Sequence, residues 1–143
     1  DIVEDGTHTI GWDGYFPKGE TVSQQLVIPK QLPKWLTEAD VDFYVGEHTN
    51  NGFRGGINWY RNIKRIPGIL APFAGRTIEQ PSLYLYGEYD LIAGNNEAAV
   101  EATSSLLPDL RGNIKFEGAG HWLQQERPQE VNKALLEFLA GLD

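Results

Sequence analysis

The last third of the chain alternates short apolar runs with helical patterns. Residues 82–86 are almost continuously apolar and lie between a proline and a glycine, which is typical of a strand covered on both faces of a parallel sheet. A helical pattern between residues 95 and 108 follows, then a second short strand over 113–117 and a final helix that begins at Pro128. This order predicts a strand–helix–strand–helix unit whose two strands are parallel neighbours.

Two strands alone leave this unit incomplete. A two-stranded sheet is only marginally stable, and strands that are apolar on both faces need neighbours to cover them. The sequence also contains no methionine, not even at position 1. We therefore expect the chain to be the back part of a larger protein whose earlier part supplies the remaining strands. The alternative is a second polypeptide that supplies them.

The composition excludes several classes of function. The 143 residues include 20 acidic and 12 basic side chains, and the formal net charge of −8 argues against nucleic acid or an anionic membrane as a partner. No apolar run approaches the ~20 residues that span a bilayer, and no signal-peptide pattern is visible. The absence of cysteine excludes disulfides, a thiolate nucleophile and cysteine-bound metals. We expect a cytoplasmic protein.

The part of the chain before these strands contains two helical patterns. Thr37 is placed to cap a helix that stops at Gly52. A second helix is expected after Gly55–Gly56, with Pro67–Gly68 closing it. The opening of the chain shows little periodicity, and the run 22–28 fits either a strand or an irregular segment.

A carboxylate and an imidazole follow the two predicted strands at matching positions. Asp90 and His121 each lie four residues beyond the last residue of a strand. Because functional side chains gather at the carboxyl ends of parallel strands, we expect these two side by side. A carboxylate that accepts from one ring nitrogen fixes the tautomer and leaves the other nitrogen free to take a proton. Each residue alone fits an ordinary structural role, but the pair favours a general base and the acid that orients it.

A general base needs a nucleophile to activate, and the chain offers none in a suitable setting. No serine lies in the Gly-x-Ser-x-Gly pattern that exposes a nucleophile after a strand. Ser82 opens a strand, and Ser104 and Ser105 fall late in a helix. The nucleophile is therefore expected outside these 143 residues.

Several linked segments carry a recognisable pattern. Residues 52–62 read GFRGGINWYRN and are preceded by LPKWLTEAD at 32–40. Further on come Gly-Glu-Tyr-Asp at 87–90 and GHWLQQERP at 120–128. In this order they closely resemble two cap-domain segments, the acid turn and the histidine loop of the α/β-hydrolase-fold epoxide hydrolases. The resemblance covers residues 32–142, and its Asn-Trp-Tyr-Arg-Asn segment is the most diagnostic part.

The resemblance implies the fold class and its division. The chain would be α/β: the C-terminal part of an α/β-hydrolase fold, with parallel strands and flanking helices, plus a helical cap segment. Residues 1–78 would form the cap (lid) segment, mostly helical from about residue 37, and 79–143 the C-terminal βαβα portion of the core. The family's N-terminal part, with the nucleophilic aspartate and a second cap tyrosine, has no counterpart here. The fold is incomplete without that part, and this chain alone is expected to be inactive.

The resemblance also implies a role for each candidate residue. Such enzymes open an epoxide by attack of an aspartate and then hydrolyse the alkyl-enzyme ester to a vicinal diol. Tyr60 would donate to the epoxide oxygen, His121 would activate the hydrolytic water, and Asp90 would orient His121. Trp59 and Trp122 would contact the substrate. No metal and no organic cofactor is implied.

Two alternatives remain open. A haloalkane or haloacid dehalogenase of the same fold also uses an aspartate, a histidine and an acid, but it binds halide with cap donors such as tryptophan, and Trp59 lies beside Tyr60. A non-catalytic binding module on a degenerate hydrolase is the other. The implied partners are a small-molecule epoxide and the N-terminal part of the same enzyme. The oligomeric state, a homodimer included, stays open.

Overall fold

The computed structural model describes residues 18–20, 30–90, 92–93 and 97–142, so the run 22–28 lies outside the described residues. The described elements follow one another in this order along the chain: α2 (Glu38–Asn51), α3 (Arg54–Arg61), η1 (Ile63–Arg65), α4 (Ile66–Leu70), η2 (Ala71–Phe73), β1 (Ser82–Gly87), α5 (Glu97–Leu106), β2 (Leu110–Phe116), α6 (Leu123–Glu126) and α7 (Pro128–Ala140). The predicted α/β class is confirmed. Helix α6 is an element that the sequence did not predict.

Helix α2 begins and ends where the sequence predicts. The hydroxyl of Thr37 accepts from the N–H of Asp40 (3.2 Å), and the Asp40 carboxylate accepts from the N–H of Thr37 (2.8 Å). This capping box satisfies two N–H groups that the first turn of a helix otherwise leaves without partners. Gly52 ends the helix with φ of 65°, a left-handed conformation that favours glycine.

The second helical region differs from its prediction at both ends. Helix α3 already starts at Arg54, so the Gly55–Gly56 pair lies inside the helix rather than before it. Pro67–Gly68 does not close the region either, because Pro67 lies in the first turn of α4. A proline there costs no helical hydrogen bond, since the N–H groups of a first turn have no partner within the helix.

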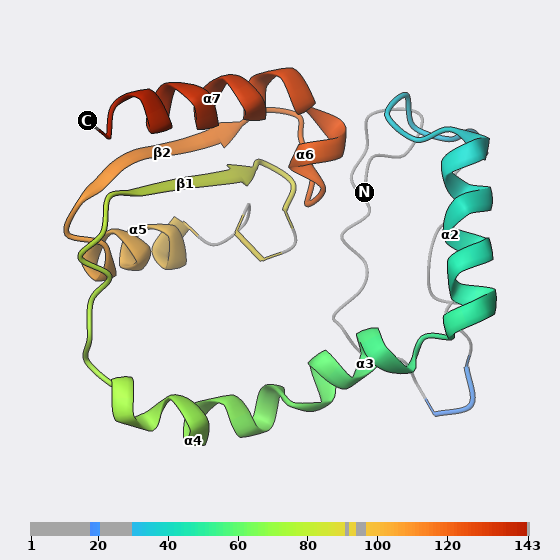
Figure 1. Cartoon of the computed structure of the whole chain (residues 1–143), viewed down its shortest axis with the longest axis horizontal. Coiled ribbons are helices and arrows are strands. Elements are labelled where there is room, and N and C mark those ends of the chain that lie inside the picture. Colours follow the sequence, from blue (N-terminus) through green and yellow to red (C-terminus); the bar gives the residue numbers. More distant parts are fainter. Residues whose placement is uncertain (1–17, 21–29, 91, 94–96, 143) are drawn as a thin grey trace.

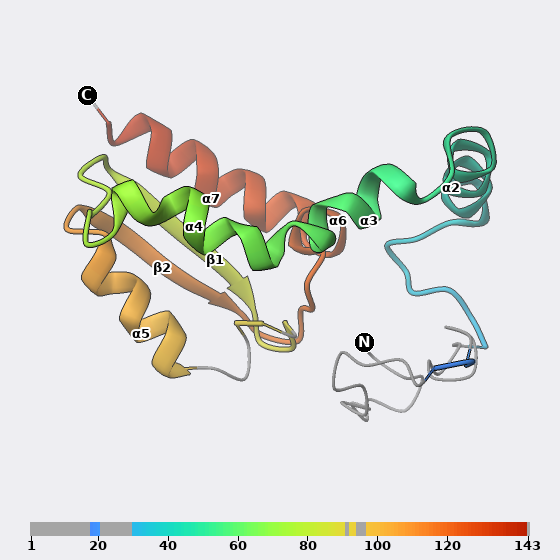
Figure 2. The ribbon, with the colours of Figure 1, turned by 90° about the horizontal axis from the view of Figure 1, so that it is seen from below.

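Strands β1 and β2 are parallel neighbours, as predicted, and form the whole sheet within the described residues. Strand β2 begins at Leu110, three residues before the predicted start, because its pairing extends back to Ser82 past an irregularity in the register. Figures 1 and 2 show α7 on one face of the sheet and α5 on the other. The strand–helix–strand–helix unit is therefore layered as the sequence pattern requires.

The buried core is small and gathers near the carboxyl ends of the strands. It consists of Phe116, Ala119, Leu123 and Val131, with Leu85 packed against them. The strands themselves are less covered than predicted: β1 is half-buried along most of its length, and most of β2 is exposed. One helix on each face leaves much of this two-stranded sheet open, which agrees with the expectation that further strands outside these 143 residues are needed to cover it.

Helices α2, α3 and α4 run along a separate path from the sheet (Figure 1). These helices and the turn between α2 and α3 expose large apolar side chains, including Phe43 at 63% and Phe53 at 62%. One polar contact joins this region to the rest of the described chain: the side-chain amide of Gln125 donates to the hydroxyl of Tyr44 over 3.1 Å. No helix among the described residues is both long enough and apolar enough to cross a membrane.

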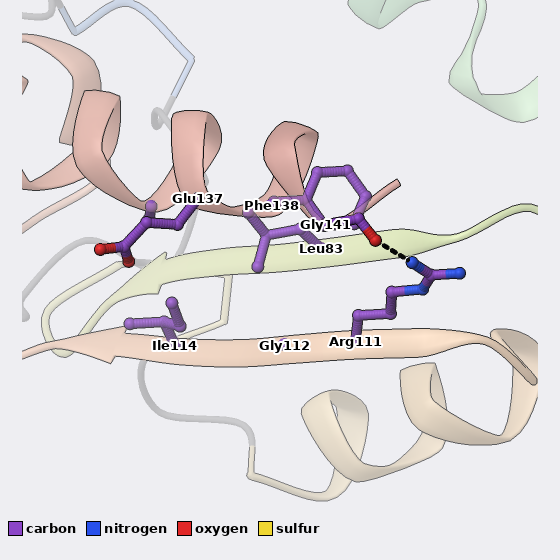
Figure 3. Close-up of a pocket in the computed structure, with 8 residues that line it drawn as sticks. Leu83, Arg111, Gly112, Ile114, Glu137, Phe138 and Gly141 are labelled. Carbon is purple, nitrogen blue, oxygen red and sulfur yellow. Dashed lines mark hydrogen bonds between the residues drawn. The ribbon is translucent and has the colours of Figure 1, made fainter. Parts of the chain in front are cut away.

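A cavity of about 280 Å³ opens between α7 and the two strands (Figure 3). Leu83, Ile114 and Phe138 form much of its apolar lining. At one end Arg111 donates to the carbonyl oxygen of Gly141 over 2.6 Å and so links β2 to the end of α7. No predicted site residue lines this cavity, so we regard it as a packing feature of the helix–sheet interface.

Candidate active site

Asp90 and His121 meet just beyond the carboxyl ends of β1 and β2. Nδ1 of His121 donates to Oδ2 of Asp90 over 2.8 Å. Asp90 is buried, with 8% of its surface exposed, whereas the His121 side chain is 49% exposed. The juxtaposition predicted from the strand order is therefore present. The catalytic roles of the two residues stay predictions.

The surroundings of Asp90 favour its ionised form. Burial raises the pKa of Asp90, but hydrogen bonds from the backbone N–H groups of Ala93 and Ile92 and from the His121 imidazole outweigh it, so the pKa lies below its ordinary value of 3.8. Both N–H groups donate to Oδ1, over 2.9 Å and 2.7 Å. An ionised carboxylate only accepts hydrogen bonds, so Nδ1 of His121 must carry the proton. In the neutral ring, Nε2 is then free to accept one.

Backbone hydrogen bonds join the two loops that carry this pair. Beyond the end of the strands, the N–H of Glu88 donates to the carbonyl of Phe116 (3.0 Å) and that of Tyr89 to the carbonyl of Ala119 (2.9 Å). The Glu88 carboxylate in turn accepts from the N–H of Gly118 (2.9 Å). The two loops thus continue the parallel pairing past the strands. Asp90 and His121 are therefore held side by side beyond the strand ends.

Glycine allows the two loops to approach this closely. A Cβ atom on Gly87 would lie 2.1 Å from the carbonyl oxygen of Gly120 and 2.5 Å from that of Ala119. Real Cβ contacts are essentially never shorter than 3.0 Å. Gly118 has φ of 68°, so the turn after β2 also uses a conformation that side chains disfavour. The acid turn therefore packs against the backbone of the histidine loop without an intervening side chain.

Trp122 and Glu126 complete the immediate surroundings of His121. The Trp122 ring meets the imidazole edge to face, with ring centroids 5.3 Å apart, and is 55% exposed. The Glu126 carboxylate accepts from the backbone N–H groups of Gly120 and Trp122. The sequence pattern pointed to neither Glu126 nor Glu88. The available sequence signal was a carboxylate close to a glycine-rich loop that leads into a helix.

Tyr60 and Trp59 lie elsewhere, on α3. Their side chains are 71% and 76% exposed. Within the described residues, no hydrogen bond or ring contact joins either one to Asp90, His121 or Trp122. The structure thus brings together three of the five predicted site residues and leaves the two on α3 apart from them.

A metal centre finds no support in the part of the chain that the structure describes. No group of three or more histidine, cysteine, aspartate or glutamate side chains there could hold a metal ion. The pair at the end of the strands is one carboxylate and one half-exposed imidazole, which suits proton transfer: the buried carboxylate holds the ring through Nδ1 and leaves Nε2 to accept a proton.

No family model matches the chain. Among curated relatives, epoxide hydrolase A of Mycobacterium tuberculosis is 46% identical over 121 residues, which cover 83% of this chain and 36% of the relative. Among solved structures, an epoxide hydrolase from an endophytic Streptomyces matches with a TM-score of 0.82 and 42% identity, over 88% of this chain and 38% of that one. Epoxide hydrolase I of potato matches with a TM-score of 0.78 and 30% identity, over 88% and 41%.

The strands and helices around Asp90 and His121 are part of an α/β-hydrolase fold. Within that class, the chain matches the C-terminal region of epoxide hydrolases. It spans about 36% of the length of the curated relative to which it is 46% identical.

Proposed function

We propose that the chain forms the acid–base part of an enzyme that hydrolyses epoxides to vicinal diols. The observation that carries the proposal is the 2.8 Å hydrogen bond between His121 and Asp90 at the ends of two parallel strands. A carboxylate–imidazole pair of this kind can take a proton from water and give it up again. The 46% identity to an epoxide hydrolase supports the choice of reaction.

The reaction proceeds in two steps. A carboxylate oxygen of an aspartate attacks an epoxide carbon, the carbon–oxygen bond of the ring breaks, and the released oxygen takes a proton from Tyr60. A water molecule then gives a proton to Nε2 of His121 while its oxygen attacks the ester carbonyl, and collapse of the adduct releases the diol and restores the aspartate. His121 finally returns its proton to the Tyr60 phenolate, so that one epoxide and one water yield one diol.

The acid–base pair suits the second step in particular. The half-exposed imidazole has its Nδ1 held by a buried acceptor, which leaves Nε2 for the water. The charge that develops on the imidazole in this step is stabilised by the ionised Asp90. The proposed triad consists of these two residues and the nucleophilic aspartate.

The remaining parts of the site come from outside the histidine loop. We propose that the nucleophile belongs to the N-terminal part of the enzyme, which the longer relatives have and which these 143 residues do not cover. Residues 1–78 would act as the cap, in which the Tyr60 hydroxyl donates to the epoxide oxygen and Trp59 contacts substrate, while Trp122 forms a wall beside His121. The exposure of all three aromatic side chains is compatible with a surface that a substrate and the N-terminal part cover together.

The proposed reaction also gives a physiological role. Epoxides are strained electrophiles that alkylate nucleophilic groups, and conversion to a diol removes that reactivity. We propose detoxification of small epoxides in the cytoplasm as this role.

The test uses the full-length gene product that carries these residues. Incubated with styrene oxide, it is expected to form the diol, whereas a bromoalkane should release no bromide. The His121→Gln variant should accumulate an alkyl-enzyme adduct visible as a mass increase. Bromide release without diol formation would instead support a dehalogenase. A protein that releases neither product would support the non-catalytic binding module.

A further inference from the structure

One side chain fixes the backbone on both sides of His121. Oε2 of Glu126 accepts from the N–H of Gly120 over 2.6 Å, and Oε1 accepts from the N–H of Trp122 over 3.0 Å. The histidine therefore lies between two backbone groups that one carboxylate holds. Hydrogen bonds to a charged acceptor are shorter and stronger than those between neutral groups.

The loop is shaped to admit this carboxylate. A Cβ atom on Gly120 would lie 3.0 Å from Oε1 of Glu126 and 3.4 Å from Oε2. A distance of 3.0–3.4 Å is tighter than nine in ten real Cβ contacts. Glycine at position 120 thus lets the carboxylate reach the N–H groups in front of and behind the histidine.

Glu126 itself is held firmly at the end of the short helix α6. Its N–H donates to the carbonyl of Trp122 (2.9 Å), and Leu123, one turn earlier, is buried in the core cluster. The next residue, Arg127, donates to the carbonyl oxygen of Glu117 (2.9 Å) and so ties the helix back to the end of β2. The carboxylate is consequently anchored to the same core that supports the strands.

We propose that Glu126 is a positioning residue that sets the height and rotation of His121 over Asp90 for hydrolysis of the alkyl-enzyme ester. The inference rests on the proposed function of His121. It extends the site from a carboxylate–imidazole pair to a chain of three: Glu126 fixes the loop backbone, the backbone fixes the imidazole, and Asp90 fixes the tautomer. Glu126 acts through the backbone and does not touch the reacting atoms.

The experiment compares Glu126→Gln and Glu126→Ala in the full-length gene product under single-turnover conditions. The amide oxygen of glutamine can accept a hydrogen bond from one of the two N–H groups, but its NH₂ group cannot accept one from the other. Alanine can accept a hydrogen bond from neither. Ester hydrolysis should therefore slow by about 10-fold for glutamine and about 100-fold for alanine, as expected for a catalytic group displaced by about 1 Å. Ester formation should change less than twofold, because His121 acts only in the second step.

Glu101→Gln is the matched control. It removes the same charge from an exposed position on α5 and should leave both steps within twofold of the parent. A second readout is independent of turnover: the Nδ1–H proton resonance of His121, which the Asp90 hydrogen bond protects from exchange, should broaden in the Glu126 variants and stay sharp in the control. Thermal unfolding of each variant shows that the protein compared is folded.

The outcomes separate the two proposals. If His121→Gln traps the ester but a folded Glu126→Ala hydrolyses it at the parental rate, only the positioning role is overturned. Equal slowing of both steps in Glu126→Ala, with the Nδ1–H resonance unchanged, would also overturn it, because that result indicates a general loss of structure. If His121→Gln hydrolyses the ester normally, the proposed function fails and the role of Glu126 fails with it.

Discussion

Gly87→Ala should damage the candidate site more than any other single methyl group added to a described glycine. The new Cβ would lie 2.1 Å from the carbonyl oxygen of Gly120, 2.5 Å from that of Ala119 and 2.8 Å from the Ala119 carbonyl carbon. To restore the shortest distance to 3.0 Å, the acid turn and the histidine loop must separate by at least 0.9 Å. The neighbours are backbone atoms, so no side-chain rotation can relieve the clash.

The separation has two measurable consequences. Overpacking of this kind costs about 1–3 kcal/mol of folding free energy, and the hydrogen bond from Tyr89 to Ala119 is stretched as well. The 2.8 Å contact between His121 and Asp90 would lengthen past the ~3.2 Å limit of a good N–H···O bond. A displacement of about 1 Å in a catalytic group lowers activity by about 100-fold.

The assay is urea unfolding of the full-length gene product combined with epoxide turnover. Gly46→Ala is the control, because a Cβ at Gly46, within helix α2, meets nothing within 4 Å in the described residues. That substitution should stabilise the protein by about 0.5–1 kcal/mol through helix propensity and leave turnover unchanged. A Gly87→Ala protein as stable and as active as the parent would refute the close packing of the two loops.

Three further substitutions test other contacts. Asp90→Asn should lower turnover by about 100-fold or more, since an amide cannot both accept from the two backbone N–H groups and hold the His121 tautomer; parental turnover would contradict the pairing. Because the pKa of Asp90 is lowered, its ionised form stabilises the folded protein above about pH 4. This contribution is lost as the pH falls through the folded-state pKa of Asp90. Urea midpoints measured from pH 6 to 2 should therefore fall less steeply in Asp90→Asn than in the parent. Leu123→Ala should cost about 2–5 kcal/mol in urea unfolding, since Leu123 is 6% exposed in the core cluster, and a cost below 1 kcal/mol would contradict its anchoring role. Thr37→Ala should lower stability by about 1 kcal/mol through loss of the capping box, with a larger loss for Thr37→Ala than for an Asp40→Asn variant that retains the hydroxyl cap.

The relation of Asp90 to His121 could be predicted because it depends on strand order alone. Once β1 and β2 are parallel neighbours, residues at equal distances beyond their ends arrive at the same edge. Helix α2 was predictable for a similar reason: Thr37, Asp40 and Gly52 are local signals whose partners lie within the same turn.

Other features depend on partners that the sequence pattern does not reveal. Helix α6 is a single turn of four residues, too short to show a helical period. The start of β2 at Leu110 follows from pairing with Ser82, because the sequence around Arg111–Gly112 gives no strand signal of its own. Glu126 was missed because its partners are backbone N–H groups, which every residue type supplies.

The same distinction explains why Asp90 and His121 are brought together here, whereas Tyr60 and Trp59 on α3 stand apart from them. Among the described residues, the contacts that hold Asp90 against His121 come from two loops within residues 87–126, supported by the core cluster at the ends of the strands. Tyr60, in contrast, lies on a helix whose apolar faces are exposed and whose region touches α6 through the Gln125–Tyr44 hydrogen bond. The proposed site needs both groups, so it would have to obtain the position of Tyr60 from packing of α2 and α3 against other parts of the proposed enzyme. Substitutions in the two loops should therefore disturb ester hydrolysis first, whereas substitutions on the apolar faces of α2 and α3 should disturb epoxide opening first.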